Sequence, residues 1–344
     1  MVCEVPEARP LGPDAEGQWV RRWGSAGWER EVDAWVGQRL GERGRRVVGA
    51  AVTYRARFWS VVRCYPTDEG LVWFKENNPG HRFEAGLVAA MAEVAPEYVV
   101  VPIAVNRERS WLLTDDQGAT LTQVDVADQA TRRTVVRAVA RMQRALHGRV
   151  AAPPGVIELA PSAAGERVRA VAREWAALPS AHPLRIAPEL LDRVEEAADV
   201  LDRRTASISD LVPLDLEVND VYPANIFADR TTGVLRPRFF DFGNTLWAHP
   251  FVTLHGFLDS VAEWTRAPLS PKDHADLLTT YLTTWHLDAD PAVLREDLEA
   301  TRPLLHAHRL ISWLRLIPYA DPTELRTRAR IPLTYLTAIT QMWR

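Results

Sequence analysis

Apolar side chains in the first third of the chain follow two different spacings. Over residues 19–40 and again over 81–94 they recur every three or four positions, the spacing of one face of a helix. Residues 45–118 also contain runs rich in β-branched and aromatic side chains, such as 70–75 and 110–114, which are typical of strands. The pattern predicts a sheet accompanied by two helices in this part of the chain.

The pattern becomes mostly helical after residue 118. Residues 128–147 carry one apolar stripe, and 166–204 carry further stripes on either side of a break at His182-Pro183. A connector rich in Pro and Ala, residues 151–165, lies between these segments. Two short apolar runs, 226–228 and 234–240, interrupt the helical region and predict a short hairpin with Gly233 in its turn.

Length and composition narrow the class of protein. With 344 residues, 47% hydrophobic and 25% charged, the chain is typical of a soluble globular protein with two lobes or domains. Its net charge of −4 argues against nucleic acid as a partner, and no apolar run of membrane-spanning length is present. The first residues lack the pattern of a secretory signal, and only two cysteines, Cys3 and Cys64, occur. We therefore expect a cytoplasmic protein without nucleic-acid or membrane partners, and its oligomeric state stays open.

Residues suited to phosphoryl transfer gather between Asn219 and Gly243. Asp220 is followed five residues later by Asn225, and Asp241-Phe242-Gly243 follows the predicted hairpin. In phosphoryl transfer a carboxylate orients the attacking hydroxyl, while an Asn and a second Asp hold magnesium against the nucleotide phosphates. Each of these motifs alone is typical of side chains that cap turns. In series, across a short hairpin, they predict a catalytic loop followed by a metal loop.

The segment from Leu216 to Phe227, Leu-Glu-Val-Asn-Asp-Val-Tyr-Pro-Ala-Asn-Ile-Phe, resembles the signature of the aminoglycoside phosphotransferase family. That family is similar in fold to eukaryotic protein kinases and phosphorylates hydroxyl groups of small molecules. The resemblance implies an α+β, bilobal, protein-kinase-like fold. Residues 1–118 would form an amino-terminal helix and a small nucleotide-binding lobe, with an antiparallel sheet plus a helix. Residues 119–344 would form a larger, mostly helical catalytic lobe, in which the helices of 166–204 belong to a substrate-binding subdomain.

One position departs from the family pattern. Val218 stands where the family has a His that braces the catalytic loop against the metal loop. A Val side chain fills the volume but donates no hydrogen bond, so the bonding partner of that His needs another donor. This substitution leaves a nucleotide-binding pseudokinase as an alternative to an active enzyme.

The resemblance also assigns a nucleotide site in the small lobe. Lysine is rare here, since Lys75 and Lys272 are the only two lysines among 41 basic residues. Lys75 closes the strand at 70–75, where the family places the amine that contacts the phosphates. Glu84 on the next helix is its expected partner, with Glu93 as the alternative. Without the resemblance, Lys75 would be interpreted as a solvated lysine at a strand end.

Two further elements complete the expected nucleotide site. The strand at 110–118, which ends with Asp116 and Gly118, looks like the family's hinge, whose backbone contacts the adenine or guanine base. An ordinary strand with an acidic turn is the alternative. No Gly-x-Gly-x-x-Gly pattern occurs over residues 47–62. We therefore expect residues 54–57 to form the turn over the phosphates, with Arg55 or Arg57 near them.

Together these residues predict a magnesium-dependent kinase that uses ATP or GTP to phosphorylate a hydroxyl of a small molecule. Asp220 would be the catalytic base, and Asn225 and Asp241 would hold Mg²⁺. Residues 251–344 contain 11 acidic and 10 basic side chains, a balance that gives no strong attraction for a polycation. The acceptor is thus open between an antibiotic, of the aminoglycoside or nucleoside type, and a primary metabolite. A helical interaction protein, in which the motif residues only cap turns, is the competing hypothesis from outside the enzymes.

Other conspicuous polar residues lie in the carboxy-terminal region. His249 stands beside a Pro, and the predicted last helices carry His306, His308, Trp313 and Arg315. We expect all five to be structural residues of a helical bundle.

Overall fold

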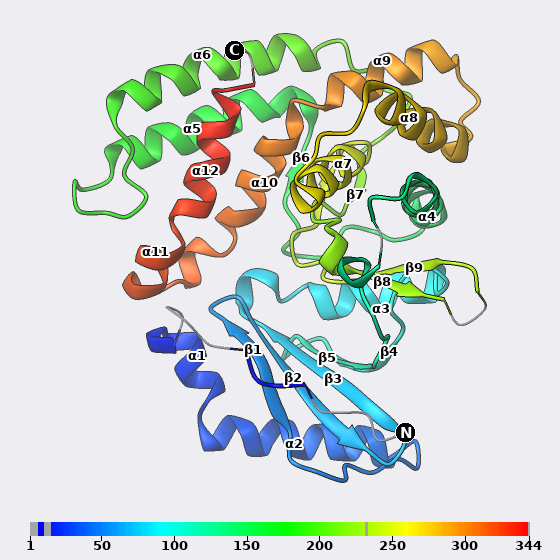
Figure 1. Ribbon diagram of the computed structural model, residues 1–344. Helices are drawn as coiled ribbons and strands as arrows, with labels where there is room; N and C mark the ends of the chain where they lie inside the picture. The colour runs from blue at the N-terminus through cyan, green and yellow to red at the C-terminus, as the bar shows by residue number, and fades with distance from the viewer. Residues whose placement is uncertain (1–5, 10–14, 125, 231–232, 343–344) are drawn as a thin grey trace.

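The computed structural model describes residues 6–9, 15–124, 126–230 and 233–342 (Figure 1). A small lobe built on one sheet lies against a larger helical lobe, so the expected α+β bilobal architecture is confirmed. Cys64 is buried in the sheet, and Cys3 lies outside the described residues. Within the described ranges, no helix combines the length and the apolar character that crossing a membrane requires.

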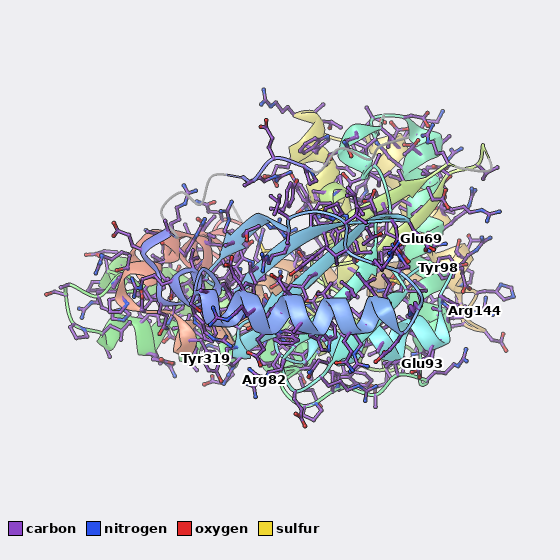
Figure 2. The ribbon with its side chains drawn as sticks, turned by 90° about the horizontal axis from the view of Figure 1, so that it is seen from below. Glu69, Arg82, Glu93, Tyr98, Arg144 and Tyr319 are labelled. Atoms are coloured by element: carbon purple, nitrogen blue, oxygen red, sulfur yellow. The ribbon has the colours of Figure 1, made fainter. Side chains whose placement is uncertain are left out.

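The small lobe contains five antiparallel strands in the order β1-β2-β3-β5-β4. Their bounds are β1 (Val52–Arg57), β2 (Ser60–Thr67), β3 (Gly70–Asn77), β4 (Pro102–Asn106) and β5 (Trp111–Asp115). Side chains alternate between the two faces of a strand. Val72 and Phe74 on β3 therefore pack under α2 (Ala26–Gly41), and Lys75 points to the opposite face. Figure 2 shows α2 crossing the outer face of the sheet.

The second helix of this lobe, α3 (Glu84–Val94), lies between the sheet and the helical lobe (Figure 1). Its expected start at His81 is three residues early, because Pro79–His81 form a short 3-10 helix instead. Asn78 caps that turn by accepting a hydrogen bond from the backbone of Gly80. Glu84 consequently sits in the first turn of α3, buried and facing β3.

The single helix expected over residues 19–40 is two helices. α1 (Gln18–Trp23) ends at Gly24, and α2 begins after Ser25. The Ser25 hydroxyl accepts a hydrogen bond from the backbone of Trp28, the usual device for starting a helix. A capping residue inside a continuous apolar stripe therefore broke the helix that the spacing alone predicted.

Glu76 on β3 anchors both of these helices to the sheet. The residue is 2% exposed, and its carboxylate accepts hydrogen bonds from three indole N–H groups and one guanidinium. The donors are Trp23 at 3.1 Å, Trp28 at 2.7 Å, Trp111 at 2.6 Å and Arg22 at 2.9 Å. A buried carboxylate is tolerated only when its oxygens are bonded in this way.

We predict that Glu76→Ala destabilises the protein by about 3 to 5 kcal/mol, the usual range for breaking a buried charged network. The substitution leaves three buried indole donors and Arg22 without their acceptor. Urea unfolding followed by circular dichroism measures the change, and Glu93→Ala, an exposed glutamate on α3 (Figure 2), is the control expected to stay within about 0.5 kcal/mol of the unaltered protein. A loss below about 1 kcal/mol for Glu76→Ala would contradict the anchoring role.

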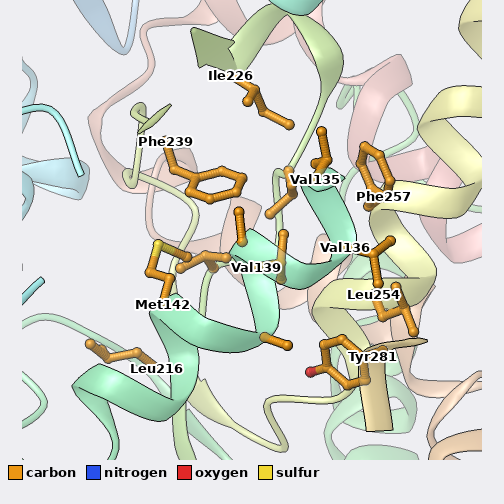
Figure 3. Packing of buried hydrophobic residues seen from close by; sticks show 14 of the residues in the cluster. Val135, Val136, Val139, Met142, Leu216, Ile226, Phe239, Leu254, Phe257 and Tyr281 are labelled. Carbon is orange, nitrogen blue, oxygen red and sulfur yellow. The ribbon is translucent and has the colours of Figure 1, made fainter. Parts of the chain in front are cut away.

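The larger lobe is built around α4 (Gln129–Leu146). As its apolar stripe predicted, Val135, Val136, Val139 and Met142 are fully buried, and Figure 3 shows them among side chains from the hairpin and from α7 (Val252–Thr265). The other helices are α5 (Ala164–Ala177), α6 (Pro188–Thr205), α8 (Pro271–Trp285), α9 (Pro291–Thr301), α10 (Leu304–Leu314), α11 (Pro322–Arg328) and α12 (Arg330–Ile339). The break expected at His182-Pro183 lies in the connection between α5 and α6.

Two small sheets position the loops of this lobe. β6 (Glu158–Leu159), β10 (Leu246–Ala248) and β7 (Asp215–Glu217) form one sheet. β8 (Ile226–Asp229) and β9 (Arg236–Phe239) form the expected hairpin, whose turn includes residues 231–232 outside the described ranges. The residue before β8 and the residues after β9 therefore lie at the same end of the hairpin.

Candidate active site

The β8–β9 hairpin brings the predicted catalytic and metal loops together. Ile226 pairs with Phe239 in its register, so Asn225 lies next to the start of the metal loop. The backbone N–H of Phe240 donates to the Asn225 carbonyl at 3.2 Å. The Asn225 side-chain amide donates to the backbone oxygen of Asp220 at 3.1 Å and to its Oδ2 at 3.3 Å.

Asp220 is half-buried, and two amides hold it. Asn244, one residue beyond the Asp-Phe-Gly motif, donates from Nδ2 to Asp220 Oδ2 at 3.2 Å. Burial and the neighbouring charge of Asp241 raise the pKa of Asp220 above its usual range, while Arg309, Asn244 and Asn225 hold it down. A carboxylate with a raised pKa is better suited to accept a proton near neutral pH.

Lys75 joins the small lobe to the metal loop. Its Nζ lies 2.8 Å from both oxygens of Glu84 and 2.7 Å from Asp241 Oδ1. Glu84 also accepts hydrogen bonds from Asn77 Nδ2 at 2.6 Å and from the backbone of Phe242 at 3.0 Å. The alternative partner, Glu93, is exposed on α3.

The charges of this cluster reinforce one another. Burial would lower the pKa of Lys75, but Asp241 and Glu84 raise it above its usual range. Burial would raise the pKa of Asp241, but Lys75 and Arg55 outweigh that effect and hold it at about 2. Lys75 is thus a cation and Asp241 an anion at neutral pH, as both would need to be beside magnesium and phosphate.

Two neighbouring cavities meet at these residues. The inner cavity, about 420 Å³, lies against the sheet and is lined by Lys75, Glu84, Asp116, Gly118, Asn225 and Asp241. The helical cavity, about 370 Å³, is walled by the β1–β2 hairpin, the catalytic loop, α10 and α12, and its lining includes Asp220, Asn225, Asp241 and Asn244. Asn225 and Asp241 belong to both walls, whereas Asp220 lines the helical cavity.

The segment after β5 forms the far end of the inner cavity. Asp116 Oδ1 accepts a hydrogen bond from the Trp73 indole at 2.9 Å. Gly118 has a φ of +75°, a conformation that suits glycine. Both residues line the inner cavity, and they directly follow β5, the strand that we expected to act as the hinge.

Asn219, next to Val218, donates hydrogen bonds to the backbone of the metal loop and of α10. Val218 is 3% exposed and packs in the core. The neighbouring Asn219 has a φ of +56°, which turns its side chain toward the metal loop, where Nδ2 lies 3.3 Å from the carbonyl of Asn244 and 3.2 Å from that of His308. A left-handed Asn therefore connects the two loops in place of a His.

Arg315 braces the same loop from the end of α10. Its two terminal nitrogens donate to the carbonyls of Thr245 at 2.7 Å and Gly243 at 2.9 Å, and its guanidinium lies 4.7 Å from the ring centroid of Phe83. We expected Arg315 to be a residue of the helical bundle, and this interpretation was incomplete, because its polar contacts are to the metal loop. His308 matches the expectation better, since it is fully buried with Nδ1 at 3.1 Å from Glu217.

The prediction of a turn at residues 54–57 is wrong. These residues belong to β1, and Arg57 pairs with Ser60, so Phe58 and Trp59 form the turn. Phe58 is buried against Trp313 and Leu316 of the helical lobe, and the Trp59 and Trp313 rings are 5.6 Å apart. Aromatic packing across the lobes thus holds a turn that has no glycine. Arg55 lines both cavities and Arg57 only the helical one.

The helices of 166–204 were expected on the substrate side. Among the described residues, however, no residue of α5 or α6 lines either cavity. They pack on each other and support α10 and α12 instead. His249 is buried, with Nδ1 accepting from the backbone of Phe251, which agrees with a structural role.

Asn225 and Asp241, at the junction of the cavities, offer oxygen atoms that fit a magnesium ion. Phosphate and water would complete the coordination of such an ion. Since Asn225 donates through Nδ2, its Oδ1 is left to act as a ligand beside the Asp241 carboxylate. Across the described ranges, no cluster of three or more His, Cys, Asp or Glu side chains could hold a metal by itself. Mg²⁺ commonly takes only one or two carboxylates from the protein and completes its shell with substrate phosphate.

Sequence reasoning missed four residues of this site. Asn244 lies one position after a recognised motif, so its spacing was the available signal. Asn219 was visible beside the unusual Val218. Arg309 and Arg315 reach the site only through the packing of α10, and no local pattern marks them.

Solved small-molecule kinases and phosphotransferases share this fold. An ethanolamine kinase from Plasmodium vivax superposes with a TM-score of 0.59 at 10% identity, covering 97% of this chain and 95% of that one. Macrolide 2′-phosphotransferase type I gives 0.53 at 12% identity, covering 89% and 96%. A spectinomycin phosphotransferase, solved with ADP and spectinomycin, gives 0.53 at 8% identity, covering 87% and 92%.

The sequence itself matches no protein-family profile and no curated protein. At such low identities a structural likeness establishes the fold. The protein-kinase-like fold and the resemblance read from the catalytic loop are therefore confirmed at the level of architecture.

Proposed function

We propose that this protein transfers the terminal phosphoryl group of a nucleoside triphosphate to a hydroxyl group of a small molecule. The observation that carries the proposal is the meeting of two cavities at Asn225 and Asp241, with Lys75 on one side and Asp220 on the other. Phosphoryl transfer needs this arrangement, because donor and acceptor must approach the same phosphorus atom from opposite sides.

The inner cavity is the proposed nucleotide site. The base would lie by the segment that carries Asp116 and Gly118, and the phosphates would reach Lys75, which Glu84 orients. Asn225 and Asp241 would hold Mg²⁺, which neutralises charge on the phosphates when bound. Our proposal covers both ATP and GTP as donor.

The helical cavity is the proposed acceptor site. Asp220 would receive the proton of the attacking hydroxyl, and the amides of Asn225 and Asn244 would keep its carboxylate in one orientation. Since the transition state of phosphoryl transfer is loose, most of the acceleration would come from positioning and charge neutralisation.

The link between Asn219 and Asn244 favours an active enzyme over the pseudokinase alternative. The argument for a pseudokinase began from the missing donor at Val218 and the absent glycine-rich loop, and for the first of these Asn219 provides a donor to the metal loop. Lys75, Asp220, Asn225 and Asp241 are all present, so no group of the proposed chemistry is lacking.

Antibiotics and primary metabolites are both candidate acceptors, because proteins of this fold act on both kinds of compound. Cytoplasm is the compartment we propose, since the proposed phosphoryl donor is available there. The experiment that tests the function incubates the protein with Mg²⁺, ATP or GTP and a panel of hydroxylated antibiotics and metabolites. Mass spectrometry then detects any compound that gains one phosphoryl group. Failure of every compound, together with absence of magnesium-dependent nucleotide binding, would reject the proposal.

We predict that Asn244→Ala moves the acidic limb of the pH profile of kcat/KM to higher pH. The amide of Asn244 lowers the pKa of Asp220, so its removal raises that pKa further. Activity depends on the deprotonated base, and it is therefore present above this pKa and lost as the pH falls through it. A profile of the variant with any phosphorylated acceptor measures the shift, and a limb that stays in place would contradict the role of Asn244.

A further inference from the structure

The helical cavity has a strongly basic lining. Four arginines line it, Arg9, Arg55, Arg57 and Arg309, against two carboxylates, Asp220 and Asp241. Both carboxylates are needed for the proposed chemistry. His81, which also lines the cavity, is neutral because burial lowers its pKa well below the usual value. Among the residues that the structure describes, the wall therefore offers a ligand cation no carboxylate beyond those two.

The donor nucleotide accounts for only part of this positive charge. Arg9 and Arg55 also line the inner cavity, and Arg55 lies 3.9 Å from Asp241, so both are close to the proposed phosphate position. Arg57 and Arg309 line the helical cavity and not the inner one, and of these two Arg57 already interacts with another group of the protein. Arg309 comes from α10, in the lobe opposite the β1–β2 hairpin, and it is half-buried.

Two of the four aromatic residues of the cavity lie near an arginine. Trp59, Tyr222, Trp313 and Tyr335 line the wall, and such rings bind quaternary ammonium groups in some proteins. Here the Arg309 guanidinium lies 6.0 Å from the ring centroid of Tyr335, and that of Arg328 lies 5.3 Å from that of Trp59. The acidic residues whose charges reach Tyr222 and Tyr335 are Asp220, which the chemistry requires, and Glu263, which is exposed and outside the lining.

We propose that the acceptor is a hydroxylated compound that carries an anionic group, a carboxylate or a phosphate monoester. This inference rests on the proposed function. The anionic group would bind Arg309, because a guanidinium matches two oxygens of such a group. The body of the acceptor would lie against the rings of Trp59, Trp313 and Tyr335.

The chemical step follows from this placement. The acceptor hydroxyl oxygen forms a bond to the terminal phosphorus, and the bond between that phosphorus and the bridging oxygen of the donor breaks. Asp220 receives the hydroxyl proton, and the nucleoside diphosphate leaves with the bonding electron pair. Arg309, whose charge also lowers the pKa of Asp220, would bind the anionic group of the acceptor and so determine specificity.

A binding experiment tests the charge preference without knowledge of the natural acceptor. Hydroxylated fragments matched in size, in anionic, neutral and cationic classes, are screened by ligand-observed NMR against the protein saturated with Mg²⁺ and ADP. We expect the best anionic fragments to bind at least about tenfold more tightly than their cationic counterparts, the scale of one charged hydrogen-bonded contact. Arg309→Glu should remove this preference or reverse it. Arg144→Glu, an exposed arginine on α4 (Figure 2), is the matched control and should keep it.

Each outcome of the screen bears on the proposal. Cationic or neutral binders that match or exceed the anionic ones, or an absence of anionic binders, would overturn it. A preference that survives in both Arg309→Glu and Arg309→Gln would overturn it as well. Protection by Mg²⁺ and ADP against thermal unfolding shows that each variant is folded. Failure of the proposed function has a different signature, because anionic fragments would still bind but none would gain a phosphoryl group in the presence of ATP or GTP.

Discussion

Asp241→Ala is expected to abolish the protection that Mg²⁺ and ADP give against thermal unfolding. The carboxylate lines both cavities, contacts Lys75 and is the principal anionic ligand of the proposed ion. A ligand present at one hundred times its dissociation constant stabilises the folded state by about 2.7 kcal/mol. We expect this gain in the unaltered protein and none in the variant, and phosphoryl transfer should disappear with it.

Differential scanning fluorimetry measures this effect in paired samples, one with Mg²⁺ and ADP and one with ADP and a chelator. Asp288→Ala, which removes an exposed aspartate between α8 and α9, is the control and should keep the full protection. If Asp241→Ala were protected as well as the unaltered protein, the metal loop would have another role.

The second large effect is expected from Asp220→Asn, which should lower turnover by about 100 to 10,000 fold. The amide preserves the shape of the side chain but accepts a proton poorly, so the attacking hydroxyl loses its base. Because Asp220 lines the helical cavity and not the inner one, protection by Mg²⁺ and ADP should be retained. Steady-state kinetics with a phosphorylated acceptor gives the ratio of kcat values. Turnover close to that of the unaltered protein would mean that another group takes the proton.

Much of the architecture was predictable because its signals are local. The stripe of α4, the strand character of β3 and the hairpin between Asn225 and Asp241 each depend on residues close in sequence. The order of these elements then placed Lys75, Asp220 and Asp241 in one site. Hydrogen bonds connect Lys75 with Asp241 and Asn225 with Asp220, as expected for side chains of one site. These contacts do not test a catalytic role.

The remaining features depend on contacts between distant residues. Arg315 donates to the metal loop from 72 positions away in sequence. The spacing of apolar residues does not predict such a contact. The turn at Phe58 and Trp59 was missed for a similar reason, because its stability comes from Trp313 and Leu316 and not from turn residues. The break between α1 and α2 has a local signal, Gly24 followed by the capping residue Ser25. We missed it because the apolar spacing continues on both sides of these residues.

The aromatic turn between β1 and β2 couples any separation of the two lobes to the exposure of apolar side chains. Movement of the small lobe away from α10 would separate this turn from Trp313 and Leu316. Lifting would expose Phe58 and Leu316 to water, at a cost of about 25 cal/mol for each Å² of apolar surface. A glycine-rich hairpin would lift without that cost. We therefore expect any opening of the lobes, and any release of product that depends on it, to carry the cost of exposing this apolar contact.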